Sequence, residues 1–137
     1  LNDGMGYYVV EQLVQSMTKK NIKLEGSNIL IMGLSFKENC PDLRNTRVID
    51  VVKKLEAYNA NVSVFDPWVS KTKAKKELNI DLINKPELNN YDAIMITVAH
   101  DKFKDMGISG IEALGKKNRV IYDLKYLLPS SKSDLRL

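Results

Sequence analysis

Residues 28–34, NILIMGL, form an apolar run that is too short for a helix and is bounded by Gly26 and Gly33. Such a run is typical of a strand that is buried on both faces of a sheet. A long polar stretch follows it, so the strand is expected to end in a loop. We predict that residues 28–34 form the first and central strand of the fold.

After this strand, strand-like and helix-like patterns alternate along the chain. The expected strands are β-branched or apolar, and they lie at residues 61–65, 80–83, 92–99 and 120–124. The expected helices lie at residues 46–58, 71–78 and 108–114. Asp42 or Asn45 is available to cap the first of these helices, and Gly115 is expected to end the last.

This alternation implies right-handed crossovers between parallel strands, with helices on both faces of the sheet. We therefore predict an α/β fold, a Rossmann-like three-layer sandwich with a mostly parallel sheet. Numbered along the sequence, its expected strands would be ordered 3-2-1-4-5. Ligands are expected at the carboxyl ends of the strands.

An N-terminal helix over residues 5–19 is expected to precede the sheet. Its apolar side chains recur at helical spacing, at Val10, Leu13, Val14 and Met17. The chain starts at Leu1 and enters this helix almost at once, so we expect it to be part of a longer protein. Residues 26–137 would form the Rossmann-like domain.

The composition is that of one globular domain. The chain has 137 residues, of which 44% are hydrophobic and 28% are charged, an ordinary balance for a folded protein. Its one cysteine, Cys40, excludes an internal disulfide and a cysteine-based zinc site, which fits a reducing, cytoplasmic compartment. No apolar run approaches the ~18 residues of a membrane span, so no membrane partner is expected.

The net charge of +4 comes from 21 Lys and Arg residues against 17 Asp and Glu residues. Lysines cluster at residues 19–20, 71–76 and 116–117, without aromatic residues between them. A nucleic-acid interface would combine basic and aromatic side chains on one face. We interpret these lysines as a solvated surface and expect no nucleic-acid partner, although a small anionic ligand remains compatible.

A long polar loop, residues 33–46 (GLSFKENCPDLRNT), lies between the central strand and a helix. Backbone amides and the helix dipole favour an anion at such a place. Lys37 adds a positive charge, Gly33 would let a ligand approach the backbone, and Phe36 would pack on a base or fill the core. The loop has only one of the three glycines of a dinucleotide-binding fingerprint, so a normal NAD site is not expected.

Three further candidate residues follow other strands. Asp66 ends the second strand, where an acid can contact a ribose or simply begin a turn with Pro67. His100, the only histidine, could act as a base or bind phosphate, but without an orienting acid it is more often a loop residue. Lys125 follows the last expected strand and would either join Lys37 on an anion or lie in solvent.

Four segments resemble the C-terminal domain of the UDP-glucose/GDP-mannose dehydrogenase family, and the resemblance extends over nearly the whole chain. The four segments are residues 33–55 (GLSFKENCPDLRNTRVIDVVKKL), 64–68 (VFDPW), 92–104 (DAIMITVAHDKFK) and 120–129 (VIYDLKYLLP). The resemblance implies that residues 1–25 are a connector helix at the end of the family's central domain. The ENCPDLRN form of the loop is similar to the branch that oxidises UDP-N-acetylhexosamines, derivatives of GlcNAc or ManNAc, for capsule and O-antigen synthesis.

The resemblance implies an NAD-dependent enzyme that oxidises C6 of a UDP-sugar from alcohol to carboxylate through a cysteine. That cysteine and the NAD domain lie in segments that this sequence lacks, and Cys40 does not match the cysteine motif. We therefore expect no catalytic residue, no metal and no bound cofactor in this fragment, which would be inactive alone. Its partners would be a UDP-sugar and the missing NAD-binding and central domains, in a homo-oligomer.

The resemblance also implies roles for individual residues. Those expected to contact the UDP-sugar are Ser35, Phe36, Lys37 and Lys125. Those expected to shape the loop are Gly33, Asp42, Arg44 and Asn45. Lys125 stands where glucose-oxidising relatives have one of two paired arginines, and Asp66 and His100 are possible further contacts.

Two other classes of function are compatible with the sequence. A receiver-like signalling module would use Asp66, Thr97 and Lys125 at strand ends. It also needs an acidic pair after the first strand to hold Mg²⁺, where this chain has the run from Ser35 to Lys37. A module that contributes only oligomer contacts would fold but bind no nucleotide.

Overall fold

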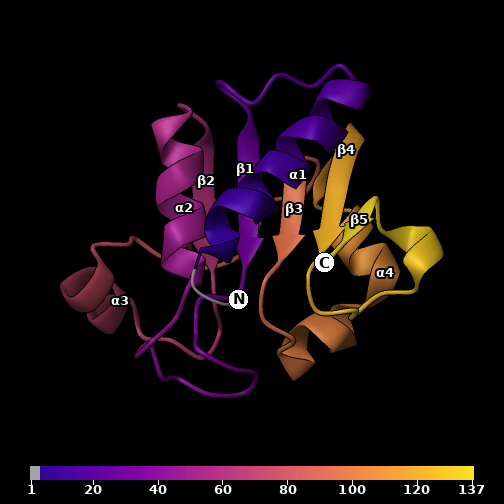
Figure 1. The fold of residues 1–137 in the computed structure, drawn as a ribbon. Helices are drawn as coiled ribbons and strands as arrows, with labels where there is room; N and C mark the ends of the chain where they lie inside the picture. The colour runs from indigo at the N-terminus through magenta and orange to yellow at the C-terminus, as the bar shows by residue number, and fades with distance from the viewer. Residues whose placement is uncertain (1–3) are drawn as a thin grey trace.

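The computed structural model describes residues 4–137 and contains a five-stranded sheet in which all paired strands are parallel. The strands are β1 (Asn28–Met32), β2 (Asn61–Phe65), β3 (Tyr91–Ile96), β4 (Gly115–Asp123) and β5 (Leu135–Arg136). Their order in the sheet is β2-β1-β3-β4-β5, so β1 lies between β2 and β3 (Figure 1). The helices are α1 (Met5–Lys19), α2 (Val48–Ala57), α3 (Lys71–Leu78), α4 (Asp101–Glu112) and the short 3-10 helix η1 (Ser130–Lys132).

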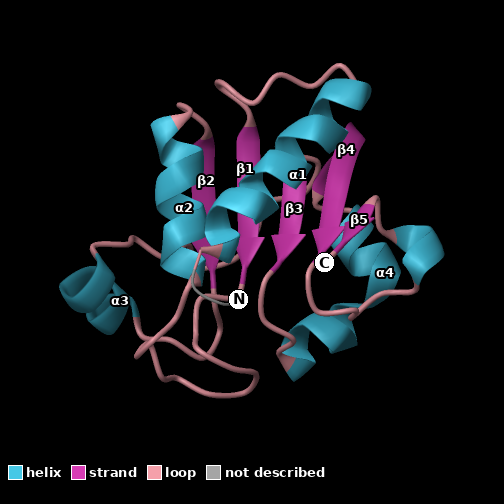
Figure 2. Ribbon diagram, in the orientation of Figure 1, coloured by secondary structure: helices cyan, strands magenta, loops and turns pink. Residues whose placement is uncertain are grey.

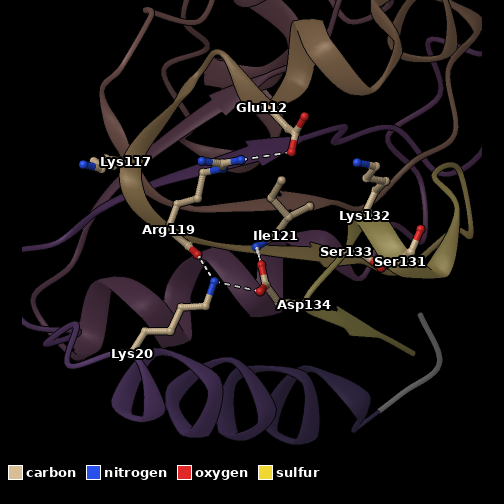
Figure 3. A pocket seen from close by; sticks show the side chains of 9 residues that line it. All are labelled: Lys20, Glu112, Lys117, Arg119, Ile121, Ser131, Lys132, Ser133 and Asp134. Carbon is tan, nitrogen blue, oxygen red and sulfur yellow. Dashed lines mark hydrogen bonds and ion pairs between the residues drawn. The ribbon is translucent and has the colours of Figure 1, made fainter.

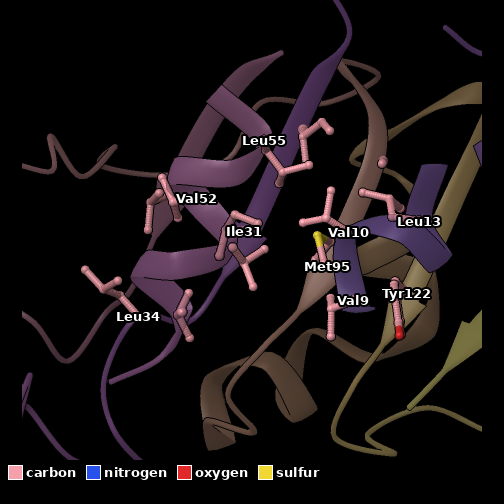
Figure 4. Packing of buried hydrophobic residues seen from close by; sticks show 14 of the residues in the cluster. Val9, Val10, Leu13, Ile31, Leu34, Val52, Leu55, Met95 and Tyr122 are labelled. Atoms are coloured by element: carbon pink, nitrogen blue, oxygen red, sulfur yellow. The ribbon is translucent and has the colours of Figure 1, made fainter. Parts of the chain in front are cut away.

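Helices α1 and α2 cover one face of the sheet, and α4 covers the other (Figure 2). Side chains of β1 alternate between the two faces. Ile29 and Ile31 face the core on the α1 and α2 side, whereas Leu30 and Met32 join the cluster on the α4 side. Figure 4 shows Ile31 in the first of these cores. All four are fully buried, which explains why successive positions of β1 are apolar. The predicted three-layer Rossmann-like sandwich is confirmed.

Helix α1 has the predicted bounds and packs into the same core as the sheet. Its buried face consists of Gly6, Val9, Val10, Leu13 and Met17. Just beyond its end, Lys20 Nζ forms an ion pair of 2.7 Å with Asp134 Oδ1, which ties the helix to the segment before β5. Whether residues 1–25 also end a preceding domain stays a prediction.

The predicted strand order holds for the four main strands, and the two sheet edges differ from the prediction. Residues 80–83 do not form a strand: Leu82 makes a single bridge to Val64 on the free edge of β2. Strand β5 was not predicted, because two residues carry no recognisable period. It extends the sheet beyond β4.

Helix α4 begins earlier than the predicted 108–114. It starts at Asp101, is interrupted at Gly107 (φ 67°), and ends at Glu112. Its first part buries only Phe103, so the local sequence shows no apolar stripe. Gly115 begins β4 instead of ending a helix, which corrects that prediction.

The predicted cap of α2 is wrong. Neither Asp42 nor Asn45 caps the helix; instead the Val48 N–H donates to Thr46 Oγ1 (3.3 Å). Asp42 is engaged with Arg44. None of the helices in residues 4–137 has the length and apolar character that crossing a membrane requires.

Gly33 lets the segments that follow β1 and β3 come close together. Its φ is +112°, and a Cβ placed there would lie 2.5 Å from Val98 Cβ and 2.8 Å from Val98 N. The neighbouring Thr97 hydroxyl donates to the Gly33 carbonyl. The close approach that we predicted for a ligand is therefore made by Val98 of the chain itself.

We expect Gly33→Ala to lower the free energy of unfolding by about 3 kcal/mol or more, because backbone strain and overlap with Val98 act together. Gly26→Ala is the matched control: its φ is +77° and no atom lies within 4 Å of the new Cβ. It should lose only about 1 kcal/mol through strain. Urea denaturation measures both, and equal losses would contradict the close-approach explanation.

Candidate functional site

The loops that follow β1 to β4 gather at one edge of the sheet, beyond the strand arrowheads in Figure 1. Because the strands are parallel, all of their carboxyl ends lie there. The loop after β1, residues 33–46, is flanked by Asp66 after β2 and by the segment 97–100 after β3. This edge brings together most of the residues that the sequence singled out.

The carboxylate of Asp66 holds the start of this loop. It is buried, and its Oδ2 accepts hydrogen bonds from the N–H groups of Leu34 (2.7 Å) and Ser35 (2.9 Å). Oδ1 accepts from the Trp68 N–H (2.8 Å), and His100 Nε2 lies 3.0 Å from Oδ2. Burial raises the pKa of Asp66, but these hydrogen bonds, led by that of His100, outweigh it and lower the pKa below its usual value.

His100 is fully buried and uses both ring nitrogens. The Asn39 N–H donates to Nδ1 (2.9 Å), so the ring hydrogen lies on Nε2, which faces Asp66. No orienting acid was predicted for this histidine, but Asp66, 34 positions away in the sequence, supplies one. His100 is therefore part of the internal framework and not an isolated loop residue.

Phe36 and Lys37 are exposed on the loop after β1. Phe36 is 53% exposed, so of its two predicted roles the structure excludes core filling. Ser35, in contrast, is 1% exposed, and its hydroxyl donates to the Lys37 carbonyl (3.0 Å). A ligand contact by Ser35 stays a prediction, and the hydroxyl is already engaged inside the loop.

The second half of the loop is held by contacts of its own. The Asp42 carboxylate accepts from Arg44 Nη2 (2.9 Å) and from the Arg44 N–H (2.8 Å). These hydrogen bonds, chiefly the one from the side chain, lower the pKa of Asp42 to about 2. The Asp42 carbonyl accepts from the Phe36 N–H (2.8 Å). Asn45 has φ 62°, a left-handed conformation that asparagine tolerates. These contacts support the loop-shaping role predicted for Asp42, Arg44 and Asn45.

Lys125 and Tyr126 are exposed after β4, which is separated from β1 by β3 in the sheet. The turn that carries them depends on Asp123, which is fully buried. Its carboxylate accepts from the N–H groups of Lys125 (3.1 Å), Leu127 (3.1 Å) and Leu128 (2.7 Å). Asp123 was not among the predicted site residues, although it ends an apolar strand just as Asp66 does.

Outside these loops, the described residues form further cavities but no metal-binding cluster. Residues 4–137 contain no group of three or more His, Cys, Asp or Glu side chains that could hold a metal ion. A cavity of about 270 Å³ lies beside β4, and Figure 3 shows the side chains that line it. Its lining contains two ion pairs, Lys20 with Asp134 (2.7 Å) and Arg119 with Glu112 (3.1 Å), and none of the predicted site residues.

A Rossmann-like parallel sheet with a long loop that exposes Lys37 after its central strand places the chain among the doubly wound α/β domains, whose ligands bind at the carboxyl ends of the strands. The family model for the UDP binding domain of the UDP-glucose/GDP-mannose dehydrogenase family matches residues 30–130. The chain belongs to this family.

Over its whole length, the chain is 56% identical to a UDP-N-acetyl-D-glucosamine 6-dehydrogenase of Pseudomonas aeruginosa and 52% identical to one of Salmonella typhi. It spans 32% of the length of each. The solved NDP-N-acetyl-D-galactosaminuronic acid dehydrogenase of Methanosarcina mazei Go1 matches with a TM-score of 0.83 at 22% identity, over 96% of this chain and 27% of that one. This likeness confirms the fold.

We expect Asp66→Asn to lower the free energy of unfolding by about 3 kcal/mol at neutral pH. An amide accepts through one oxygen only, and its NH2 group would face backbone N–H donors at the other position. Urea denaturation measures the loss. Asp105→Asn, at an exposed position, is the control and should change stability little.

Asp66 should also make stability depend on pH. Its pKa is lowered in the folded state, so the unfolded chain takes up the proton first, and stability is lost as pH falls below about 4. Denaturation curves between about pH 4 and pH 2 should be less steeply pH-dependent in Asp66→Asn than in the wild type. Identical acid dependence in the two proteins would refute the assignment.

Proposed function

We propose that this chain is the UDP-sugar-binding domain of an NAD-dependent UDP-N-acetylhexosamine 6-dehydrogenase, which oxidises a C6 alcohol to a carboxylate. The observation that carries the proposal is the exposed pair Phe36 and Lys37, held at the carboxyl end of the central strand in a member of this family. The names of the relatives at 56% and 52% identity, both UDP-N-acetyl-D-glucosamine 6-dehydrogenases, support the N-acetylhexosamine class.

Lys37 would neutralise the diphosphate of the UDP-sugar. Within residues 4–137, the N–H groups of Lys37 and Glu38 take part in no hydrogen bond, so they can donate to the same oxyanion. The exposed ring of Phe36 offers an apolar surface to the nucleoside or sugar. Lys125, from the loop after β4, would supply a second cation at the same edge.

Asp66 and His100 would support this site from inside. Both Asp66 oxygens already accept hydrogen bonds, which disfavours the ribose contact considered for it. His100 is fully buried and has no surface for a phosphate. We assign both residues to the holding of the loop after β1.

NAD and the reactive cysteine would belong to the part of the longer enzyme that this chain does not span. The residues present do not fit a dinucleotide, because Val98 occupies the space over Gly33 and the loop has no second glycine. The domain alone would bind the UDP-sugar without oxidising it. The whole enzyme would be a cytoplasmic homo-oligomer that supplies uronic acids for surface polysaccharides such as capsule or O-antigen.

Calorimetric titration with UDP, UDP-N-acetylglucosamine and NAD⁺ tests the proposal. We expect the uridine nucleotides to bind and NAD⁺ not to bind. Lys37→Ala should weaken UDP binding by about tenfold or more, since a charge-assisted contact is worth about 1.5–3 kcal/mol. Lys53→Ala removes an exposed lysine from α2 and should leave the dissociation constant within about twofold.

The proposal fails if the wild-type chain binds no uridine nucleotide, or if the Lys37 and Lys53 variants bind equally well. Labelling of Asp66 by acetyl phosphate would favour the receiver-like alternative. A folded chain that ignores every nucleotide would favour the oligomerisation alternative. Trp68, the single tryptophan, is 45% exposed next to the site and gives an independent fluorescence signal for the titration.

A further inference from the structure

We propose that His100 is a positioning residue for the UDP-sugar site: its ring holds both ends of the exposed segment 36–38 and thereby orients Phe36 and Lys37. The inference rests on the proposed function, because it concerns how that site is held before its ligand arrives. His100 is 0% exposed, so it acts through the loop and not on the ligand.

The first held end is Ser35. Its N–H donates to Asp66 Oδ2 (2.9 Å), and the same oxygen lies 3.0 Å from His100 Nε2. The Ser35 hydroxyl lies 3.3 Å from that nitrogen and donates to the Lys37 carbonyl (3.0 Å). Nε2 therefore faces the Asp66 carboxylate and the Ser35 hydroxyl, whose hydrogen bonds hold Ser35 in its buried position.

The second held end is Asn39. Its N–H donates to His100 Nδ1 (2.9 Å), and its side-chain Oδ1 accepts from the N–H of Asp101 (3.0 Å), the first residue of α4. Asn39 has φ 54°, a left-handed conformation that turns the chain back toward β3. One imidazole thus contacts the residues on both sides of segment 36–38, Ser35 through Nε2 and Asn39 through Nδ1.

The ring itself has little freedom to turn. It lies edge-on to Phe103, with 5.3 Å between ring centroids, and nearly parallel to Trp68 at 6.4 Å. Phe103 is fully buried on α4, so the ring is fixed by the core as well as by its hydrogen bonds. A cation that is held in place before binding costs less conformational entropy when the ligand arrives.

The competing explanation is that His100 only stabilises the fold. In that case, substitutions at His100 should affect UDP binding in proportion to the stability that they remove. The two ring nitrogens allow the explanations to be separated, because each can be replaced on its own. Asparagine keeps an acceptor at the place of Nδ1, and glutamine keeps a donor at the place of Nε2.

The experiment compares His100→Asn with His100→Gln in this chain. Hydrogen exchange of the Asn39 amide shows whether the second end is held, urea denaturation gives the stability, and calorimetry gives the dissociation constant for UDP. We expect both variants to lose stability. In His100→Asn the Asn39 amide should stay protected, and the Ser35 N–H keeps its hydrogen bond to Asp66 Oδ2 although Nε2 is lost. UDP affinity should therefore stay within about threefold of wild type.

In His100→Gln the Asn39 amide should exchange faster, and UDP binding should weaken by about tenfold. Equal UDP affinity in the two variants, whether both lose it or neither does, would overturn the inference. The inference would also be overturned if UDP affinity in the two variants followed their stability and not the protection of the Asn39 amide. Absence of UDP binding in the wild type would instead overturn the proposed function, while Asn39 exchange would still show whether the ring holds the loop.

Ser35→Ala provides a second variant, should the glutamine variant fail to fold. It removes one buried hydroxyl and leaves His100 and Asp66 in place. Ser27→Ala is matched to it, because the Ser27 hydroxyl is also buried and donates to a nearby carbonyl, that of Leu24 (2.6 Å), but lies before β1. Only Ser35→Ala should weaken UDP binding, by about threefold or more, and speed exchange of the loop amides. Equal binding by the two serine variants would overturn the inference.

Discussion

The buried carboxylate of Asp66 is the interaction on which the geometry of the site depends. Parallel strands end with backbone groups that the sheet no longer pairs, and these groups must find partners or remain exposed to water. Asp66 accepts N–H bonds from the loop after β1 and from its own loop after β2, and it meets His100 from the segment after β3. The cost of burying its charge is offset by these donors, so one side chain joins three loops that are far apart in sequence.

The packing of the sheet explains why polar function is confined to this edge. Helices cover both faces of β1 and β3. On one face, side chains of α1 and α2 form a single core with those of the strands. The faces of these two central strands are therefore occupied by the core, whereas the loops at their carboxyl ends are free of such packing. Asp123 repeats the arrangement after β4, where it holds the turn that carries Lys125.

Within the loop after β1, the residues that hold it and the residues it exposes are separate. Ser35 is buried and bonded inward, and the next two residues, Phe36 and Lys37, are exposed. This division suits a domain that supplies a preformed cationic contact to a nucleotide, with the reacting groups elsewhere. It also accords with a chain that spans 32% of the length of its dehydrogenase relatives.

The sequence by itself determined the central strand, the Rossmann-like class, the exact bounds of α1 and α3, and the loop that carries Lys37, because each depends on a local period, a local cap or a local charge. Only the tertiary structure decided the pairing of Asp66 with His100, the contact of Val98 with Gly33, and the place of β5. These involve residues far apart along the chain, or segments too short to show a period, so no local pattern marks them. His100 appeared to lack an acid for this reason: its partner lies 34 positions away and approaches only when β2 and β3 take their places on either side of β1.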